Sequence, residues 1–125
     1  MFDVLVLALN SEPQLEFAVL VGSRAAKTAQ QKSDWDIALQ WNAGLDWLEV
    51  LAKTETLRRK LAETMGIESE DIDLIELRRA NLTMRANVAE QGLPLTGDNS
   101  LAWAHFLKRT WRDLEDFYWE QRRAA

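Results

Sequence analysis

The stretch VGSRAAKTAQQKSDWDIAL, from Val21 to Leu39, joins two segments that both read as strands. The apolar run EFAVLV at residues 16–21 is rich in β-forming side chains and predicts a buried strand that ends at Gly22. The run DWDIALQW at residues 34–41 alternates between larger apolar and mostly polar positions, which is the pattern of a second strand. The polar residues 24–33 between them favour a short helix or an ordered loop.

The alternation over residues 34–41 assigns its side chains to two faces. One face carries Trp35, Ile37, Leu39 and Trp41, and the other carries Asp34, Asp36, Ala38 and Gln40. Asp34 and Asp36 are therefore expected to point the same way, with their carboxylates close together. Two like charges at that separation raise one another's pKa unless a cation lies between them. The pair is typical of a site for a hard metal ion such as Mg²⁺, which prefers oxygen ligands.

A third carboxylate follows in the segment IDLIEL, residues 72–77, which predicts another apolar strand. If this strand lies beside residues 34–41, Asp73 converges on the same place. Three carboxylates on adjacent strands can hold two metal ions, which clamp an in-line phosphoryl displacement. Glu76 is three residues further on and is expected to point to the opposite face, so we favour Asp73 as the third acid.

Gly22 and Ser23 supply groups suited to a phosphate. A glycine after a strand lets the backbone approach a phosphate closely, and the following amides and the serine hydroxyl can donate to it. A helix beginning there would favour the anion further. Arg24, Lys27 and Lys32 add positive charge nearby. Gly-Ser or Asp-x-Asp alone is common, but together with the Asp73 strand they predict a nucleoside triphosphate site.

The remaining chain predicts a small domain of class α/β (α+β), with a mixed few-stranded sheet covered by helices. We expect one domain over residues 1–125, with a core at about 16–99 and a C-terminal helix at about 100–123. Residues 1–9 are apolar without a clear period, which leaves a helix and a strand open. The other expected elements are a helix over 45–65 with Asn42 as a possible cap and Gly66 at its end, a helix over 81–91 that Asn81 caps, and an edge strand over 93–96.

Composition narrows the classes of function. The apolar fraction of 47% in 125 residues is enough for a packed core. The net charge of -5 argues against a protein that coats nucleic acid, which needs clustered Lys and Arg. Cysteine is absent, so we expect no disulfide and no thiolate metal site. The start of the chain lacks a basic segment and a long apolar run, so we expect no signal peptide, no membrane span and a cytoplasmic location.

The C-terminal segment is the second informative feature. Three of the six tryptophans lie there, and an apolar stripe at helical spacing runs through Trp103, Leu107, Trp111, Leu114 and Tyr118. Mixed charges surround this stripe. The pattern fits packing against the chain's own sheet, and it also fits docking on a protein partner.

The motifs VGS, ten intervening residues, DWDI and a downstream IDL resemble those of the polymerase-β-like nucleotidyltransferase superfamily. The short chain and the motifs GSRA and SDWDIAL resemble those of its minimal branch, the MNT proteins. In that family an MNT protein pairs with a HEPN partner as antitoxin and toxin. The resemblance covers about residues 16–99. One position departs from it: MNT loops often carry a glycine where this chain has Lys27, so either the loop has another shape or Lys27 contacts phosphate itself.

The resemblance implies a set of roles for the motif residues. Asp34 and Asp36 would be ligands of two Mg²⁺ ions and Asp73 the third acid. The triphosphate of ATP would lie on Gly22 and Ser23, with Arg24 and Lys27 as further nucleotide-binding residues. The implied activity is transfer of AMP from ATP to a tyrosine of a HEPN ribonuclease toxin, which neutralises it and releases pyrophosphate. The expected assembly is a hetero-oligomer with that toxin, without membrane or direct nucleic-acid binding.

Two other functions remain open at this stage. The chain could be a catalytically silent antitoxin that neutralises the toxin by binding alone, or a transferase acting on a small molecule. The presence of Asp34, Asp36 and Asp73 favours the enzyme over the silent antitoxin. The short chain leaves no room for a separate substrate domain, which counts against a small-molecule transferase.

Overall fold

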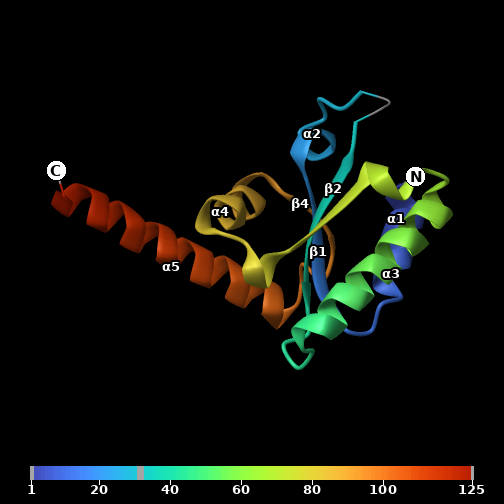
Figure 1. Ribbon diagram of the computed structural model, residues 1–125. Coiled ribbons are helices and arrows are strands. Elements are labelled where there is room, and N and C mark those ends of the chain that lie inside the picture. Colours follow the sequence, from blue (N-terminus) through green and yellow to red (C-terminus); the bar gives the residue numbers. More distant parts are fainter. Residues whose placement is uncertain (1, 31–32, 125) are drawn as a thin grey trace.

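The computed structural model describes residues 2–30 and 33–124. These residues form a four-stranded sheet of β1 (Leu15–Val21), β2 (Trp35–Trp41), β3 (Ile72–Glu76) and β4 (Leu93–Thr96). The strands lie in the order β3-β2-β1-β4 (Figure 1). β1 pairs antiparallel with both β2 and β4, whereas β2 and β3 are parallel. The predicted mixed, few-stranded sheet is confirmed.

Helices cover both faces of the sheet (Figure 1). The helices are α1 (Phe2–Asn10), one-turn α2 (Gly22–Ala25), α3 (Trp47–Met65), α4 (Leu82–Gln91) and α5 (Leu101–Ala124), with 3-10 turns η1 (Ser69–Asp71) and η2 (Leu77–Arg79). α1 and α3 pack on one face, and α4 and the first half of α5 pack on the other. The sequence left both a helix and a strand open for residues 1–9, and the structure shows that residues 2–10 form a helix. No described helix is long and apolar enough to cross a membrane.

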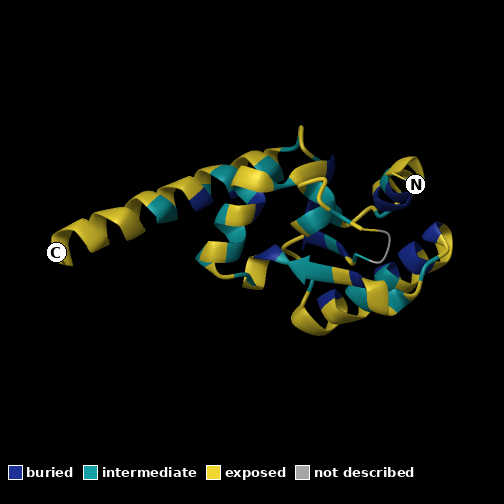
Figure 2. Cartoon of the chain, turned by 90° about the horizontal axis from the view of Figure 1, so that it is seen from above, coloured by how far each residue is buried: buried dark blue, intermediate teal, exposed yellow. Residues whose placement is uncertain are grey.

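The side-chain alternation of β2 divides the interior into two cores, as the sequence predicted. Trp35, Ile37, Leu39 and Trp41 are buried in the core under α1 and α3, whereas Ala38 belongs to the core under α4 and α5. Buried residues follow the strands and the inner helix faces (Figure 2). Because Asp36 has the same parity as Ala38, it lies on the α4–α5 side of the sheet.

Several boundaries differ by one or two residues from the sequence-based expectation, and three of them bear on the site. α3 begins at Trp47, and its cap is Asp46: the Glu49 amide donates to Asp46 Oδ1 at 2.8 Å, and the Asp46 amide donates to Glu49 Oε1 at 3.3 Å. The prediction that Asn42 caps this helix is wrong, because Asn42 Oδ1 accepts from the Gly44 amide at 2.8 Å in the preceding turn. β3 ends at Glu76 because η2 begins at the next residue. β2 begins one residue later than expected, so Asp34 precedes it.

Two predicted helix ends are confirmed. Gly66 ends α3 with φ 70°, the left-handed conformation that favours glycine. Asn81 caps α4, since its side-chain oxygen accepts from the Met84 amide at 2.9 Å. These local signals were sufficient because each depends on residues within one turn of the chain.

α5 packs on the sheet through its first half and projects from the molecule through its second half (Figure 1). Phe17 of β1 contacts Trp103 and Phe106, with ring centroids 5.0 and 5.4 Å away. The residues of α5 buried there are Phe106 and Thr110, whereas Trp111 and Tyr118 of the predicted stripe are exposed. Packing on the chain's own sheet therefore does not account for these two residues, and docking on a partner stays open for them. Periodicity alone could not show which side of the helix α4 covers. Residues 115–124 are all exposed (Figure 2).

Candidate active site

Two acidic side chains meet at neighbouring strands. Asp36 of β2 lies directly opposite Asp73 of β3 in the parallel register. Adjacent strands are about 4.8 Å apart, and paired residues share a face of the sheet, so the two carboxylates are neighbours. Burial raises the pKa of Asp36, and the negative charges of Asp73 and Asp34 raise it further. The structure therefore places Asp36 beside Asp73, with Asp34 two residues before Asp36 along the chain. Convergence of all three carboxylates on one cation stays a prediction.

The chemistry of this acid cluster suits a hard cation. All three side chains offer oxygen ligands, which Mg²⁺ prefers, and their mutual repulsion is what a cation would relieve. Within residues 2–30 and 33–124, no three His, Cys, Asp or Glu side chains lie in positions from which they could hold a metal ion together. Binding of a cation would therefore require the carboxylates of Asp34, Asp36 and Asp73 to turn toward one another.

Gly22 lies directly beside the carboxylate of Asp36. It directly follows Val21, which pairs with Asp36 across β1 and β2. Its φ is 74°, and a Cβ atom built on it would lie 2.5 Å from Asp36 Oδ2. Only glycine fits this backbone position without displacing the carboxylate. Ser23 comes next, in α2, which is a single turn, so backbone amides rather than a helix dipole are the donors available there.

Arg24 ties the two ends of the following loop together. Its Nη2 and Nε donate to the Ser33 carbonyl at 2.8 and 3.2 Å, and its guanidinium lies 4.2 Å from the centre of the Trp35 ring. These contacts hold the chain where it enters β2, beside Asp34. A role for Arg24 in nucleotide binding stays a prediction. Lys32, the other cation predicted here, lies outside the described residues.

Lys27 keeps the backbone conformation that a glycine favours. Its φ is 60°, and it is the one non-glycine residue with positive φ in the described parts of the chain. The loop therefore has a left-handed backbone conformation at Lys27, as it would with a glycine at this position. The cost of that conformation for a residue with a Cβ is about 1–2 kcal/mol. The exposed lysine side chain occupies a place where a glycine would offer only backbone.

We predict that Lys27→Gly raises the free energy of unfolding by about 0.5–1 kcal/mol, because relief of the left-handed strain exceeds the added freedom of the unfolded chain. If Lys27 also contacts the triphosphate, the same variant raises the KM for ATP several-fold. Lys27→Asn is the matched control, since asparagine tolerates positive φ but carries no charge. Equal KM values for both variants and the unsubstituted chain would exclude a phosphate contact. Chemical denaturation and steady-state kinetics measure the two effects.

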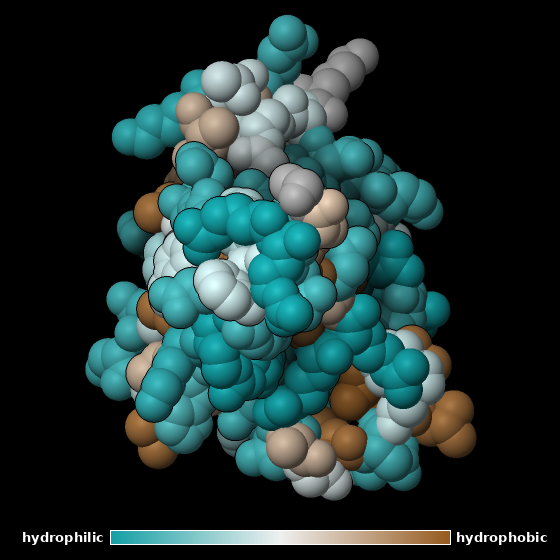
Figure 3. Space-filling model, turned by 90° about the vertical axis from the view of Figure 1, so that its left-hand side faces the viewer, coloured by the Kyte–Doolittle hydropathy of each residue, from teal (hydrophilic) through white to brown (hydrophobic). Residues whose placement is uncertain are grey.

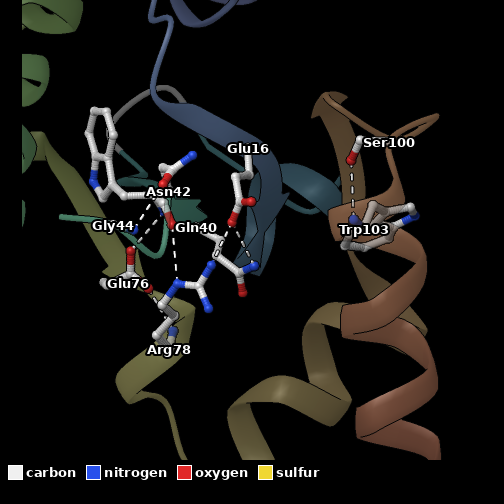
Figure 4. A network of polar contacts seen from close by, with 9 residues as sticks. Glu16, Gln40, Asn42, Gly44, Glu76, Arg78, Ser100 and Trp103 are labelled. Carbon is white, nitrogen blue, oxygen red and sulfur yellow. Dashed lines mark hydrogen bonds and ion pairs between the residues drawn. The ribbon is translucent and has the colours of Figure 1, made fainter.

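Glu76 has a different environment from Asp73. Burial raises the pKa of Glu76, while hydrogen bonds from the Arg78 and Trp41 amides oppose that rise. Its Oε2 accepts from the Trp41 amide at 3.0 Å, and its Oε1 accepts from the Arg78 amide at 2.6 Å (Figure 4). Glu76 therefore joins the ends of β2 and β3 to η2. Sequence reasoning missed this network because its members are far apart in the chain.

The fold and the acid cluster define a nucleotidyltransferase domain, and comparison with known proteins agrees. Residues 5–100 match the family model described as polymerase beta, nucleotidyltransferase. The chain belongs to this family, and the resemblance deduced from its motifs is confirmed. The matched range contains β1 to β4 and the whole of the candidate site.

The similar proteins are antitoxins and their complexes. The chain is 33% identical over 94 residues to the protein adenylyltransferase MntA of Shewanella oneidensis, an alignment that covers 75% of this chain and 63% of MntA. The chain thus matches less than two thirds of that relative. A crystal structure of a toxin-antitoxin with AMP-PNP superposes with a TM-score of 0.74 at 26% identity, covering 98% of this chain and 94% of the other. A crystal structure of the toxin-antitoxin MntA-HepT superposes with a TM-score of 0.66 at 25% identity, covering 98% and 92%.

Proposed function

We propose that this chain is an antitoxin that transfers AMP from ATP to a tyrosine hydroxyl of a cognate HEPN ribonuclease toxin and thereby neutralises it. The observation that carries the proposal is the pairing of Asp36 with Asp73 directly beside Gly22. This arrangement puts a cluster of carboxylates next to a backbone position where a phosphate can approach. The adenylyltransferase activity of MntA and the AMP-PNP in a similar toxin-antitoxin structure support the same reaction.

The proposed site has two parts, one that binds phosphate and one that binds the cation. Gly22 and Ser23 hold the triphosphate through backbone amides and the serine hydroxyl, and Asp34, Asp36 and Asp73 hold Mg²⁺. When bound, Mg²⁺ supplies positive charge that lowers the pKa of an attacking hydroxyl and stabilises the leaving group. The tyrosine oxygen attacks the α-phosphorus, the bond from that phosphorus to the bridging oxygen breaks, and pyrophosphate leaves.

The proton of the tyrosine hydroxyl passes to Asp73 or Asp36. A carboxylate with a raised pKa is a better base than an ordinary one, and the pKa of Asp36 is raised by burial and by its acidic neighbours. The same pKa shift that makes the cluster costly for folding thus suits proton transfer. ATP as the donor also fits the cytoplasmic location expected from the sequence.

The second half of α5 is available to a protein partner. Phe117, Tyr118 and Trp119 are exposed by 47%, 57% and 56%. Phe117 and Tyr118 line an open hollow together with Leu82 and Ala86 of α4. Aromatic side chains of this kind are enriched at protein interfaces. The exposed end supports a hetero-oligomer with the toxin, in which the first half of α5 remains part of the domain.

Mass spectrometry of the intact toxin after co-expression with this chain tests the proposal. We expect the toxin to gain the mass of one or more AMP units, and fragmentation to place them on tyrosine. An unmodified toxin in a stable complex would favour neutralisation by binding alone. An unmodified toxin that does not bind the chain would favour a small-molecule substrate.

A further inference from the structure

A basic hollow lies between η2, α4 and α5, away from the acid cluster. Its volume is about 320 Å³, and it is lined by Leu77, Arg78, Ala80, Arg85, Arg109 and Asp113. Small-ligand pockets range from about 300 to 1,000 Å³. The hollow begins at Leu77, directly after β3, whereas Asp73 is near the start of β3. Leu77 is four residues after Asp73, which corresponds to about 13 Å along an extended strand.

Arg78 is held in place by a polar network (Figure 4). Its Nε donates to the Trp41 carbonyl at 3.1 Å and its Nη2 donates to Glu16 Oε1 at 2.6 Å. The same Glu16 oxygen accepts from Gln40 Nε2 at 3.1 Å. A guanidinium that is already fixed loses little conformational entropy when it binds a further group, which is a property of a preformed site.

Arg85 and Arg109 approach the hollow from the two helices. Arg85 Nη1 is 3.0 Å from Asp113 Oδ2, and its side chain is 15% exposed. Arg109 forms no ion pair with any carboxylate in residues 2–30 and 33–124. Burial lowers the pKa of Arg109, and the positive charges of Arg85 and Arg78 lower it further. The three guanidiniums thus belong to residues that line one hollow, where their positive charges repel one another.

The charge balance around the hollow is positive in a chain that is acidic overall. Three arginines and one carboxylate line the hollow: Arg78, Arg85, Arg109 and Asp113. The difference is 3 − 1 = +2, whereas the whole chain carries -5. The surrounding side of the molecule, from which α5 projects, is mostly hydrophilic (Figure 3).

We propose that this basic hollow binds a phosphate monoester, as free phosphate or as the terminal phosphate of a nucleotide. A dianionic phosphate matches the local charge, whereas a single carboxylate of an acidic protein would neutralise half of it. The planar forks of three arginines also suit the several oxygens of a phosphate. This anion site is separate from the triphosphate position at Gly22 and does not depend on the proposed AMP transfer.

The test follows the arginine side-chain signals of the isotope-labelled full-length chain by NMR during titration with AMP and, separately, with inorganic phosphate. Sodium chloride holds the ionic strength constant. We expect the Nε–H signals of Arg78, Arg85 and Arg109 to move together and to saturate. Arg109→Gln weakens AMP binding at least about tenfold, because one charge-assisted contact is lost. Arg123→Gln, at the exposed end of α5, is the matched control and leaves binding unchanged.

A second variant of Arg109 distinguishes a loss of binding from a loss of folding. Arg109 also lies 5.9 Å from the centre of the Phe106 ring, so its removal could disturb packing. Arg109→Lys keeps the charge but loses the fork, and it is expected to weaken binding by a smaller factor. Saturation with both ligands, or with AMP alone, supports the anion site. Shifts that follow ionic strength only, unchanged affinity in both Arg109 variants, or tighter binding of a glutamate-rich peptide than of AMP would overturn it.

Discussion

Asp36→Asn is expected to abolish the proposed transfer of AMP to the toxin while the protein stays folded. Asparagine has nearly the same size and keeps one oxygen, but it has no negative charge for a cation and no basic oxygen for a proton. A single catalytic acid or base contributes roughly 10²–10⁴-fold, and loss of a metal ligand adds to that, so we expect at least about a 1,000-fold loss of rate. The measurement is the rate of label transfer from radioactive ATP to the purified toxin.

The same variant is expected to be as stable as the unsubstituted protein or more stable. The folded-state pKa of Asp36 is raised, so the fold favours the protonated side chain. The contribution of Asp36 to stability is therefore present at acidic pH and is lost as pH rises through its folded pKa. Asparagine removes this dependence, and the gain in Tm over the unsubstituted protein should be larger at neutral than at acidic pH.

Asp98→Asn is the control for both measurements. Asp98 is an exposed acid in the turn after β4, so its replacement should leave the transfer rate and the pH dependence unchanged. Transfer by Asp36→Asn at the normal rate would show that the acid cluster is not the catalytic centre. A loss of rate accompanied by unfolding would contradict the expectation that repulsion at Asp36 costs stability.

The sequence predicted the strand faces but not the alignment of strands. The alternation through Trp35, Asp36 and Ile37 was enough to place Asp36 on one face, since side-chain direction follows from the period of two. Whether Asp73 would lie beside Asp36 depended on which strands pair and in what register. That is a tertiary property, and the parallel pairing of β2 with β3 decides it.

Two other features were beyond sequence reasoning for the same kind of reason. Lys27 could be recognised as a departure from a glycine, but only the backbone shows that the loop keeps positive φ there. The basic hollow combines Arg78, Arg85 and Arg109 from three elements, and no local spacing relates them. Local signals predicted Gly66 and Asn81 correctly, whereas the cap of α3 moved to Asp46 because a turn intervenes.

Gly22→Ala separates the role of close packing from that of backbone conformation. At φ 74° an alanine costs about 1–2 kcal/mol relative to glycine, which lowers stability. In addition, its Cβ would lie 2.5 Å from Asp36 Oδ2, a distance that real Cβ contacts do not tolerate. Either the Asp36 carboxylate or the start of α2 must move, and both belong to the candidate site. We expect the rate of AMP transfer to fall at least about 100-fold, since misplacement of reacting groups by about 1 Å has effects of that size.

Gly66→Ala provides the matched comparison. Gly66 has nearly the same φ, 70°, but no atom lies within 4 Å of the Cβ that alanine would add. It should therefore lose a similar amount of stability through backbone strain and keep its transfer rate. Equal losses of activity in the two variants would mean that general destabilisation explains the effect of Gly22→Ala. A loss confined to Gly22→Ala would place the requirement for glycine at its contact with Asp36, the point where the phosphate side and the acidic side of the site meet.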